Sequence, residues 1–246
     1  MSLSLKFLGT GDAFGHGGRL QPCLFVRSAE TSFLVDCGAS AMVSLNRFSV
    51  DSRQIKMILL SHLHGDHFGG IPFFMLEAQL VAKRTEALVI AGPPGLEERI
   101  SGAMDIFFPG AAGVKRSFET QFIELAPGEA WAFRDVNVTP GSIDHPSGSP
   151  AYAYRLSCCG RVMAYTGDGQ WNDSLTPLLR DADVLVAESY FYEKEVKYHL
   201  NYKTLMSRMG ELAPRRAILV HMSADMLGRI GDLELEGAFD GMNIDL

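Results

Sequence analysis

Residues 55–67 read Ile-Lys-Met-Ile-Leu-Leu-Ser-His-Leu-His-Gly-Asp-His, and this stretch decides the fold class and the candidate site. Its first half, residues 55–60, is a short apolar run that predicts a buried β-strand. The run stops abruptly at a cluster of three histidines and one aspartate within six residues, 62–67. A strand that delivers imidazole and carboxylate groups to one loop is typical of a metal site.

The spacing within this cluster predicts two neighbouring ions. At the end of an extended strand, His62 and His64 point the same way and can bind one ion together. Gly65 then lets the backbone turn, so that Asp66 and His67 reach a second ion. Imidazole and carboxylate suit Zn²⁺, although Fe and Mn accept the same donors. In the alternative interpretation, Asp66 caps a helix and the histidines lie on a solvated loop.

Other strand ends supply further candidate ligands. His145 follows the run Val-Asn-Val-Thr-Pro-Gly-Ser-Ile-Asp, Asp168 ends Arg-Val-Met-Ala-Tyr-Thr-Gly-Asp, and His221 ends Arg-Ala-Ile-Leu-Val-His. Taken singly, each is more often a turn or surface residue than a ligand. Together with the 62–67 cluster, they predict one edge of a sandwich that gathers the ligands, with the Asp168 carboxylate suited to bridge two ions.

The rest of the chain alternates apolar runs with amphipathic segments. Strand-rich blocks with interspersed helices predict an α/β sandwich whose sheets are covered on their outer faces. We see no linker, so we expect one domain over residues 1–246. The first three runs, at 3–12, 22–28 and 32–38, read as an antiparallel meander. Further strands are expected at 87–95, 122–145, 161–168, 183–189 and 216–223, and helices at 41–48, 68–83, 97–107, 173–180 and 202–212.

Composition excludes several classes of protein. The chain has 246 residues, 47% of them hydrophobic, and a formal net charge of −7, which disfavours binding to an extended nucleic-acid backbone. An apolar run of 18 residues and a secretory signal are both missing, so we expect no membrane span. The four cysteines form no C-x-x-C motif and two are adjacent, which predicts a reducing cytoplasmic setting.

These motifs resemble the metallo-β-lactamase superfamily, whose signature H-x-H-x-D-H stands at residues 62–67. Within it, the chain is similar to the ribonuclease Z-like phosphodiesterase branch. LGTGDAFG, LVDCG, SHLHGDHFGGIP, AGPPGLEE, TGDG, DADVLVAES and ILVHMS follow that branch in order across nearly the whole chain. The resemblance implies a four-layer αββα sandwich that holds two divalent metal ions, preferably Zn²⁺, with Mn or Fe as alternatives.

The resemblance also assigns the ligands. It implies that one metal is held by His62, His64 and His145, that the second is held by Asp66, His67 and His221, and that Asp168 bridges them. Asp36, at the end of Leu-Val-Asp-Cys-Gly, is expected to brace the loop or a ligand imidazole.

A proton-transfer pair is implied outside the metal shell. Glu188 and His199 occupy the places of a Glu and a His that pass a proton to the leaving oxygen. The sequence departs from the usual pattern here, because Ala precedes Glu188 and Leu-Asn follows His199, so a plain surface histidine is the alternative. Asp66 is expected to accept a hydrogen bond from the nucleophilic water while it binds the metal.

A second departure concerns the arm with which ribonuclease Z grips tRNA. His145 and Asp168 are only 23 positions apart, which leaves room for two strands and a turn between them but not for such an arm. We therefore expect the substrate to be a small anionic ester rather than an extended nucleic acid.

The function expected from the sequence is hydrolysis of a small phosphodiester by a hydroxide shared between two metals. Hydrolysis of a lactone, thioester or sulfate ester on the same metals is one alternative, and a non-hydrolytic ligand-binding or sensing protein is another. A redox di-iron centre fits less well. Residues 68–81 carry more apolar side chains than one helix face needs, and the related enzymes suggest a homodimer built near here; a core helix is the plainer explanation.

Overall fold

The computed structural model describes residues 3–246 and contains two seven-stranded sheets. The strands of the first sheet, in spatial order, are β14 (Asn243–Asp245), β1 (Ser4–Gly9), β2 (Cys23–Arg27), β3 (Ser32–Val35), β4 (Ile55–Leu59), β5 (Leu88–Gly92) and β6 (Thr120–Glu124). Those of the second are β13 (Glu236–Gly237), β12 (Ala217–Val220), β11 (Val184–Glu188), β10 (Arg161–Tyr165), β9 (Ala151–Cys158), β8 (Val136–Ile143) and β7 (Trp131–Phe133). The antiparallel meander expected over the first three strands is confirmed.

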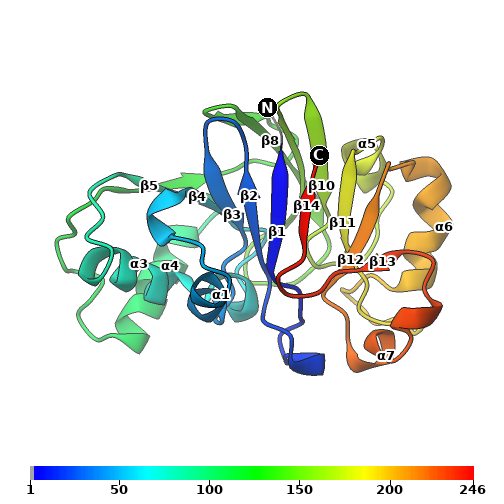
Figure 1. Cartoon of the computed structure of the whole chain (residues 1–246), viewed down its shortest axis with the longest axis horizontal. Helices are drawn as coiled ribbons and strands as arrows, with labels where there is room; N and C mark the ends of the chain where they lie inside the picture. Colours follow the sequence, from blue (N-terminus) through cyan, green and yellow to red (C-terminus); the bar gives the residue numbers. More distant parts are fainter. Residues whose placement is uncertain (1–2) are drawn as a thin grey trace.

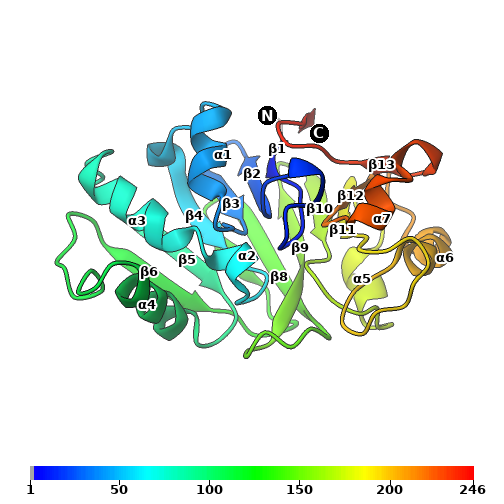
Figure 2. The same ribbon diagram turned by 90° about the horizontal axis from the view of Figure 1, so that it is seen from below.

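Helices cover the outer face of each sheet (Figure 1). On the first sheet lie α1 (Ala41–Arg47), α3 (Ile71–Leu80) and α4 (Leu96–Phe107), and the short α2 (Gly65–Phe68) follows β4. On the second lie α5 (Leu175–Leu179), α6 (Tyr202–Leu212) and α7 (Ala224–Leu227). Single 3₁₀ turns are η1 (His16–Gly18), η2 (Ser52–Gln54) and η3 (Ile230–Asp232). Figure 2 shows the two helix groups on opposite sides of the strands, as the αββα sandwich implied by the family resemblance requires.

Central strands such as β5 and β11 are buried along their whole length, because both faces of the sheet are covered there. In β11, Val184 and Val186 point into the core between the sheets, whereas Leu185 and Ala187 pack against the outer helices. β4 alternates in the same way, with Met57 inside and Ile58 outside. Such continuous runs are typical of sheets covered on both sides. Within residues 3–246, no helix is long and apolar enough to cross a membrane.

Two of the predicted helices are shorter at both ends in the structure than the sequence predicts. The helix expected over 68–83 begins at Ile71 and ends at Leu80. It stops there because Lys83 adopts a left-handed conformation and the Arg84 N–H donates back to the Ala78 carbonyl. The helix expected over 173–180 is shortened to Leu175–Leu179. The expected α6 boundaries, 202–212, are confirmed.

Candidate metal centre

The candidate site lies at the edge of the sandwich where several strands end. β3 ends one residue before Asp36, β12 ends one residue before His221, and Glu188 is the last residue of β11. The segments that follow β4, β8, β10 and β11 contribute the other side chains. The structure gathers all the predicted ligand and proton-transfer residues into three groups, of which the last two share Asp168 and His221: His62, His64 and His145; Asp66, His67, Asp168 and His221; and Asp168, Glu188, His199 and His221.

The first group consists of three imidazoles whose candidate ligand atoms lie within 4.8 Å of one another. Nε2 of His145 is 3.0 Å from Nδ1 of His64, and the ring of His62 lies edge-on to both. One detail of the sequence interpretation is wrong, because β4 ends at Leu59 and both His62 and His64 lie in the loop before α2. The backbone at His64 is nevertheless extended, with φ −83° and ψ 151°, so the expected convergence of the two rings survives.

The second group combines two carboxylates with two imidazoles. Oδ2 of Asp168 is 3.2 Å from Nε2 of His67 and 3.0 Å from Nε2 of His221. Oδ2 of Asp66 is 3.4 Å from each of the same two nitrogens. Four donors therefore surround one small volume, and two of them carry negative charge.

Hydrogen bonds on the far side of each ring fix which nitrogen faces the centre. A carbonyl only accepts, so Nε2 of His64 donates to Pro146 O at 3.2 Å, and Nδ1 of His145 donates to Tyr198 O at 2.8 Å. Each ring then presents the unprotonated nitrogen to the cluster. Metal-binding histidines are oriented by this kind of outer hydrogen bond.

Asp36 fixes which nitrogen of His67 faces the second group. Its carboxylate is fully buried and lies 2.8 Å from Nδ1 of His67, which leaves Nε2 free to face the second group. The carboxylate also accepts from the Ser61 backbone N–H and from the Tyr165 hydroxyl, each at 2.8 Å. Asp36 has φ 58°, a left-handed conformation that aspartate tolerates better than most residues. This arrangement matches the bracing role expected from the sequence.

The protonation preferences of the two groups differ. Burial, together with the neighbouring His67, lowers the pKa of His62, which favours the neutral imidazole that binds metals. Burial also lowers the pKa of His221, but Asp168, Asp66 and Glu188 outweigh it and raise this pKa to about 10. The second group thus favours a positive charge, which a divalent ion would supply.

The residues present fit a metal. Nε2 of His62, a member of the first group, is buried and has no hydrogen-bond partner among residues 3–246. An unpaired buried nitrogen is costly in a folded protein unless something binds it. A cation among the three imidazoles would satisfy it, as the donor chemistry of both groups requires.

Glu188 and His199 form a close pair beside the second group. Oε1 of Glu188 is 2.5 Å from Nδ1 of His199, and Oε2 accepts from the backbone N–H groups of Gly169 and Leu200. Glu188 is fully buried, whereas His199 is partly exposed. Burial lowers the pKa of His199, but the contact with Glu188 outweighs it and raises the pKa above its ordinary value. The carboxylate therefore holds the imidazole in place and favours its protonated form.

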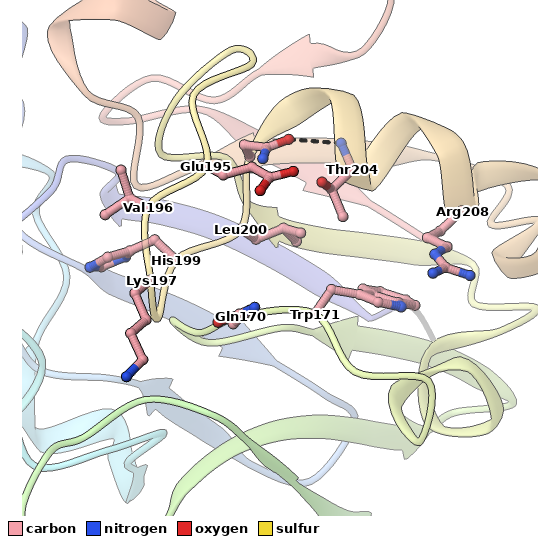
Figure 3. Close-up of a pocket in the computed structure, with 10 residues that line it drawn as sticks. Gln170, Trp171, Glu195, Val196, Lys197, His199, Leu200, Thr204 and Arg208 are labelled. Atoms are coloured by element: carbon pink, nitrogen blue, oxygen red, sulfur yellow. Dashed lines mark hydrogen bonds between the residues drawn. The ribbon is translucent and has the colours of Figure 1, made fainter.

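Two cavities meet at His199. One, of about 200 Å³, is lined by Phe14 and Tyr190 and by five of the candidate ligands, namely His64, Asp66, His145, Asp168 and His221. The other, of about 500 Å³, extends away from the ligands toward Trp171 and Arg208 (Figure 3).

Sequence reasoning missed four residues at this site. Ser61 and Tyr165 hold Asp36, Tyr190 stacks on His199 with ring centroids 4.7 Å apart, and Phe14 lines the smaller cavity. Ser61 precedes the histidine cluster and Tyr190 follows Glu188 by two residues, so only proximity in sequence could have pointed to them. Phe14 lies some fifty residues before the cluster, within the motif LGTGDAFG, which did not indicate a place beside the metal donors.

Comparison with known proteins places this site in a family context. The family described as "Anti-Pycsar protein Apyc1" matches residues 3–236. A ribonuclease Z of Limosilactobacillus fermentum is 24% identical, over 92% of this chain and 90% of the relative.

Two solved structures share the fold. The metallo-β-lactamase fold protein YhfI from Bacillus subtilis superposes with a TM-score of 0.81 and 21% identity, covering 100% of this chain and 99% of the other. The short form of human tRNase Z gives a TM-score of 0.81 and 22% identity, covering 98% of each chain. The metallo-β-lactamase fold inferred from the sequence motifs is thereby confirmed.

Proposed function

This chain belongs to the Anti-Pycsar protein Apyc1 family and has the metallo-β-lactamase fold, and from that premise we propose that it is a metal-dependent phosphodiesterase acting on a small anionic substrate. The observation that carries the proposal is the Glu188–His199 pair, which lies beside two groups of metal donors. Hydrolysis of a phosphodiester expels an alkoxide, and a histidine held by a carboxylate can protonate it.

His62, His64 and His145 would hold one divalent ion, and Asp66, His67 and His221 the other, with Asp168 between them. Two observations support a bridging role for Asp168. Its Oδ2 lies 3.2 Å from Nε2 of His67 and 3.0 Å from Nε2 of His221, both in the second group. The two groups are adjacent, because the ring centroid of His67 is 4.0 Å from that of His62 in the first group. Nitrogen and carboxylate donors favour Zn²⁺, with Mn²⁺ and Fe²⁺ as the other candidates.

When bound, such ions supply a hydroxide nucleophile near neutral pH and withdraw charge from the phosphoryl oxygens. The chain's own residues then divide the remaining work. Asp66 accepts a hydrogen bond from the attacking water, and this contact directs a lone pair of the water oxygen toward phosphorus. His199 donates its Nε2 proton to the departing oxygen, while Glu188 fixes the ring through Nδ1. Correctly placed general-acid catalysis contributes roughly 10²- to 10⁴-fold in rate.

The surroundings of the site support a small substrate. Between His145 and Asp168 the chain forms only β9 and β10, joined by the turn at 159–160. The larger cavity beyond His199, at about 500 Å³, has room for a leaving alcohol of drug-like size. The net charge of −7 disfavours an extended polyanion.

The direct test is metal analysis of protein purified without chelator, followed by assay on bis(p-nitrophenyl) phosphate, a lactone, a thioester and a sulfate ester. We expect about two ions per chain and turnover of the phosphodiester. Turnover of the lactone, thioester or sulfate ester without turnover of the phosphodiester would show that the site serves another ester class. An empty site with no turnover of any substrate would favour a ligand-binding or sensing protein.

We also propose that the protein forms a homodimer through the surface of α3 and α4. Large apolar side chains are exposed there, namely Phe73, Leu80, Val81, Ile106 and Phe107. Exposed apolar clusters of this kind mark association surfaces. Light scattering should give twice the chain mass of 26.9 kDa, and a mass near 27 kDa would exclude the dimer.

A further inference from the structure

Phe14 is the most conspicuous side chain at the mouth of the site. It is 76% exposed, yet it lines the same cavity of about 200 Å³ as Asp66, Asp168 and His221. The Phe14 side chain therefore offers an apolar aromatic surface at the edge of the cavity that holds the polar cluster, where a ligand bound in the cavity can pack against it.

Hydrogen bonds to the Asp12 carboxylate fix the backbone of the loop that carries Phe14. Asp12 is fully buried and accepts from the backbone N–H groups of Phe14 and His16, and its other oxygen lies 2.5 Å from Nδ1 of His16. This pairing also accounts for His16, the one histidine outside the metal and proton-transfer groups. Gly15 and Gly17 have φ near +67°, a conformation that permits the tight turn after Phe14.

The two ends of this loop, at Thr10 and Leu20, are fixed by hydrogen bonds, and one of these bonds reaches a proposed metal ligand. The backbone N–H of His221 donates to Thr10 O at 3.0 Å, so the loop and a proposed ligand share one backbone contact. Asp240 accepts from Thr10 N–H at 2.9 Å and from Leu20 N–H at 2.7 Å, which closes both ends of the loop. Phe14 is thus an apolar group fixed at a defined place beside the reacting centre.

We propose that Phe14 is a specificity residue that packs against a flat aromatic group on the substituent that phosphorus retains. This inference rests on the proposed phosphodiesterase function. The leaving alcohol takes its proton from His199 and extends into the larger cavity, which Phe14 does not line. The retained substituent stays in the smaller cavity, where Phe14 offers its ring face or edge.

The test compares two substrates that release the same p-nitrophenolate. Bis(p-nitrophenyl) phosphate retains an aromatic group, whereas methyl p-nitrophenyl phosphate retains a methyl group. For Phe14→Ala we expect kcat/KM to fall about 3- to 10-fold on the aromatic substrate, mainly through KM, and less than 2-fold on the methyl one. Phe14→Tyr should keep the preference of the unaltered protein for the aromatic substrate. Phe239→Ala removes another exposed phenylalanine, one that lines neither cavity, and should leave both kcat/KM values unchanged.

Three outcomes would overturn the inference while leaving the proposed function intact. Equal loss on both substrates would mean that Phe14 affects the whole site, and no loss on either would mean that it touches no substituent. A variant that changes from dimer to monomer by light scattering would place Phe14 in contact with a second copy of the chain. Failure of the unaltered protein to cleave either phosphodiester would instead refute the proposed function itself.

Discussion

At the residue scale, the site depends on which nitrogen each imidazole turns inward. The sequence predicts the ligand types, because three histidines and an aspartate within residues 62–67 have few other uses. It could not predict the outer acceptors, since Pro146 O and Tyr198 O are backbone atoms distant in sequence from the rings that they orient. Asp36 was found only through the family resemblance, and the Tyr165 hydroxyl that holds it was not found.

Asp36→Asn should weaken metal binding while preserving the fold. Asparagine tolerates the left-handed backbone at this position, but an amide is a weaker acceptor for Nδ1 of His67 than a carboxylate. Loss of such an outer contact typically lowers metal affinity about 10- to 100-fold. Titration with a competing chelator measures this. Tyr165→Phe, which leaves the contact with His67 in place, should have a smaller effect, and equal effects would contradict the role given to Asp36.

His199→Ala should separate catalysis from metal binding. We expect kcat on a phosphodiester with an alkyl leaving group to fall roughly 10²- to 10⁴-fold, because the departing alkoxide loses its proton donor. A p-nitrophenolate leaving group needs little protonation and should show a smaller loss. Metal content should remain near two ions per chain. Loss of an ion would show that His199 is a metal ligand, because His199 also belongs to the third group of candidate donors.

At the element scale, strands were predicted better than helix ends. Both faces of strands such as β5 are buried, so their apolar runs are continuous. Helix ends depend on contacts that the local sequence does not reveal. The end of α3, for example, is followed by Arg84, whose guanidinium donates to the carbonyls of Glu86 and Ala87 and turns the chain toward β5.

Asp183 joins the ends of neighbouring strands of the second sheet and should make stability depend on pH. Its carboxylate accepts from the Val162 N–H at 2.8 Å and pairs with Arg161 and Arg215. Although burial raises the pKa of Asp183, these contacts outweigh it and lower the pKa below its usual value. The stabilisation is therefore present above about pH 4, the unfolded value, and is lost as pH falls through the folded pKa.

Asp183→Asn should accordingly lower the free energy of unfolding by about 1–3 kcal/mol at pH 7. Urea denaturation of the unaltered protein and of Asp183→Asn, from pH 7 to pH 3, measures the difference between their free energies of unfolding. This difference should stay constant down to about pH 5 and shrink below pH 4. A difference that grows toward acidic pH would contradict the assignment.

At the scale of the whole molecule, each proposed metal position joins the two sheets. His62, His64, Asp66 and His67 come from the loop and short helix after β4 in the first sheet, whereas His145, Asp168 and His221 follow strands of the second. No local stretch of sequence contains a complete donor set, so only the packing of the sheets assembles it. An ion bound there would link the sheets much as a cross-link does, and would offset the repulsion between Asp66 and Asp168.

Removal of metal should therefore destabilise the entire fold and not only the site. An ion present at about 100 times its Kd adds about 2.7 kcal/mol of stability. For a chain of this size that corresponds to a fall in Tm of about 5–10 °C for each ion removed, and of about 10–20 °C when chelation removes both. Calorimetry after dialysis against EDTA, and again after Zn²⁺ is restored, measures the shift. The His62→Ala protein, which lacks a donor of the first group, should show a smaller shift. An unchanged Tm in the unaltered protein would mean that the two sheets need no ion between them.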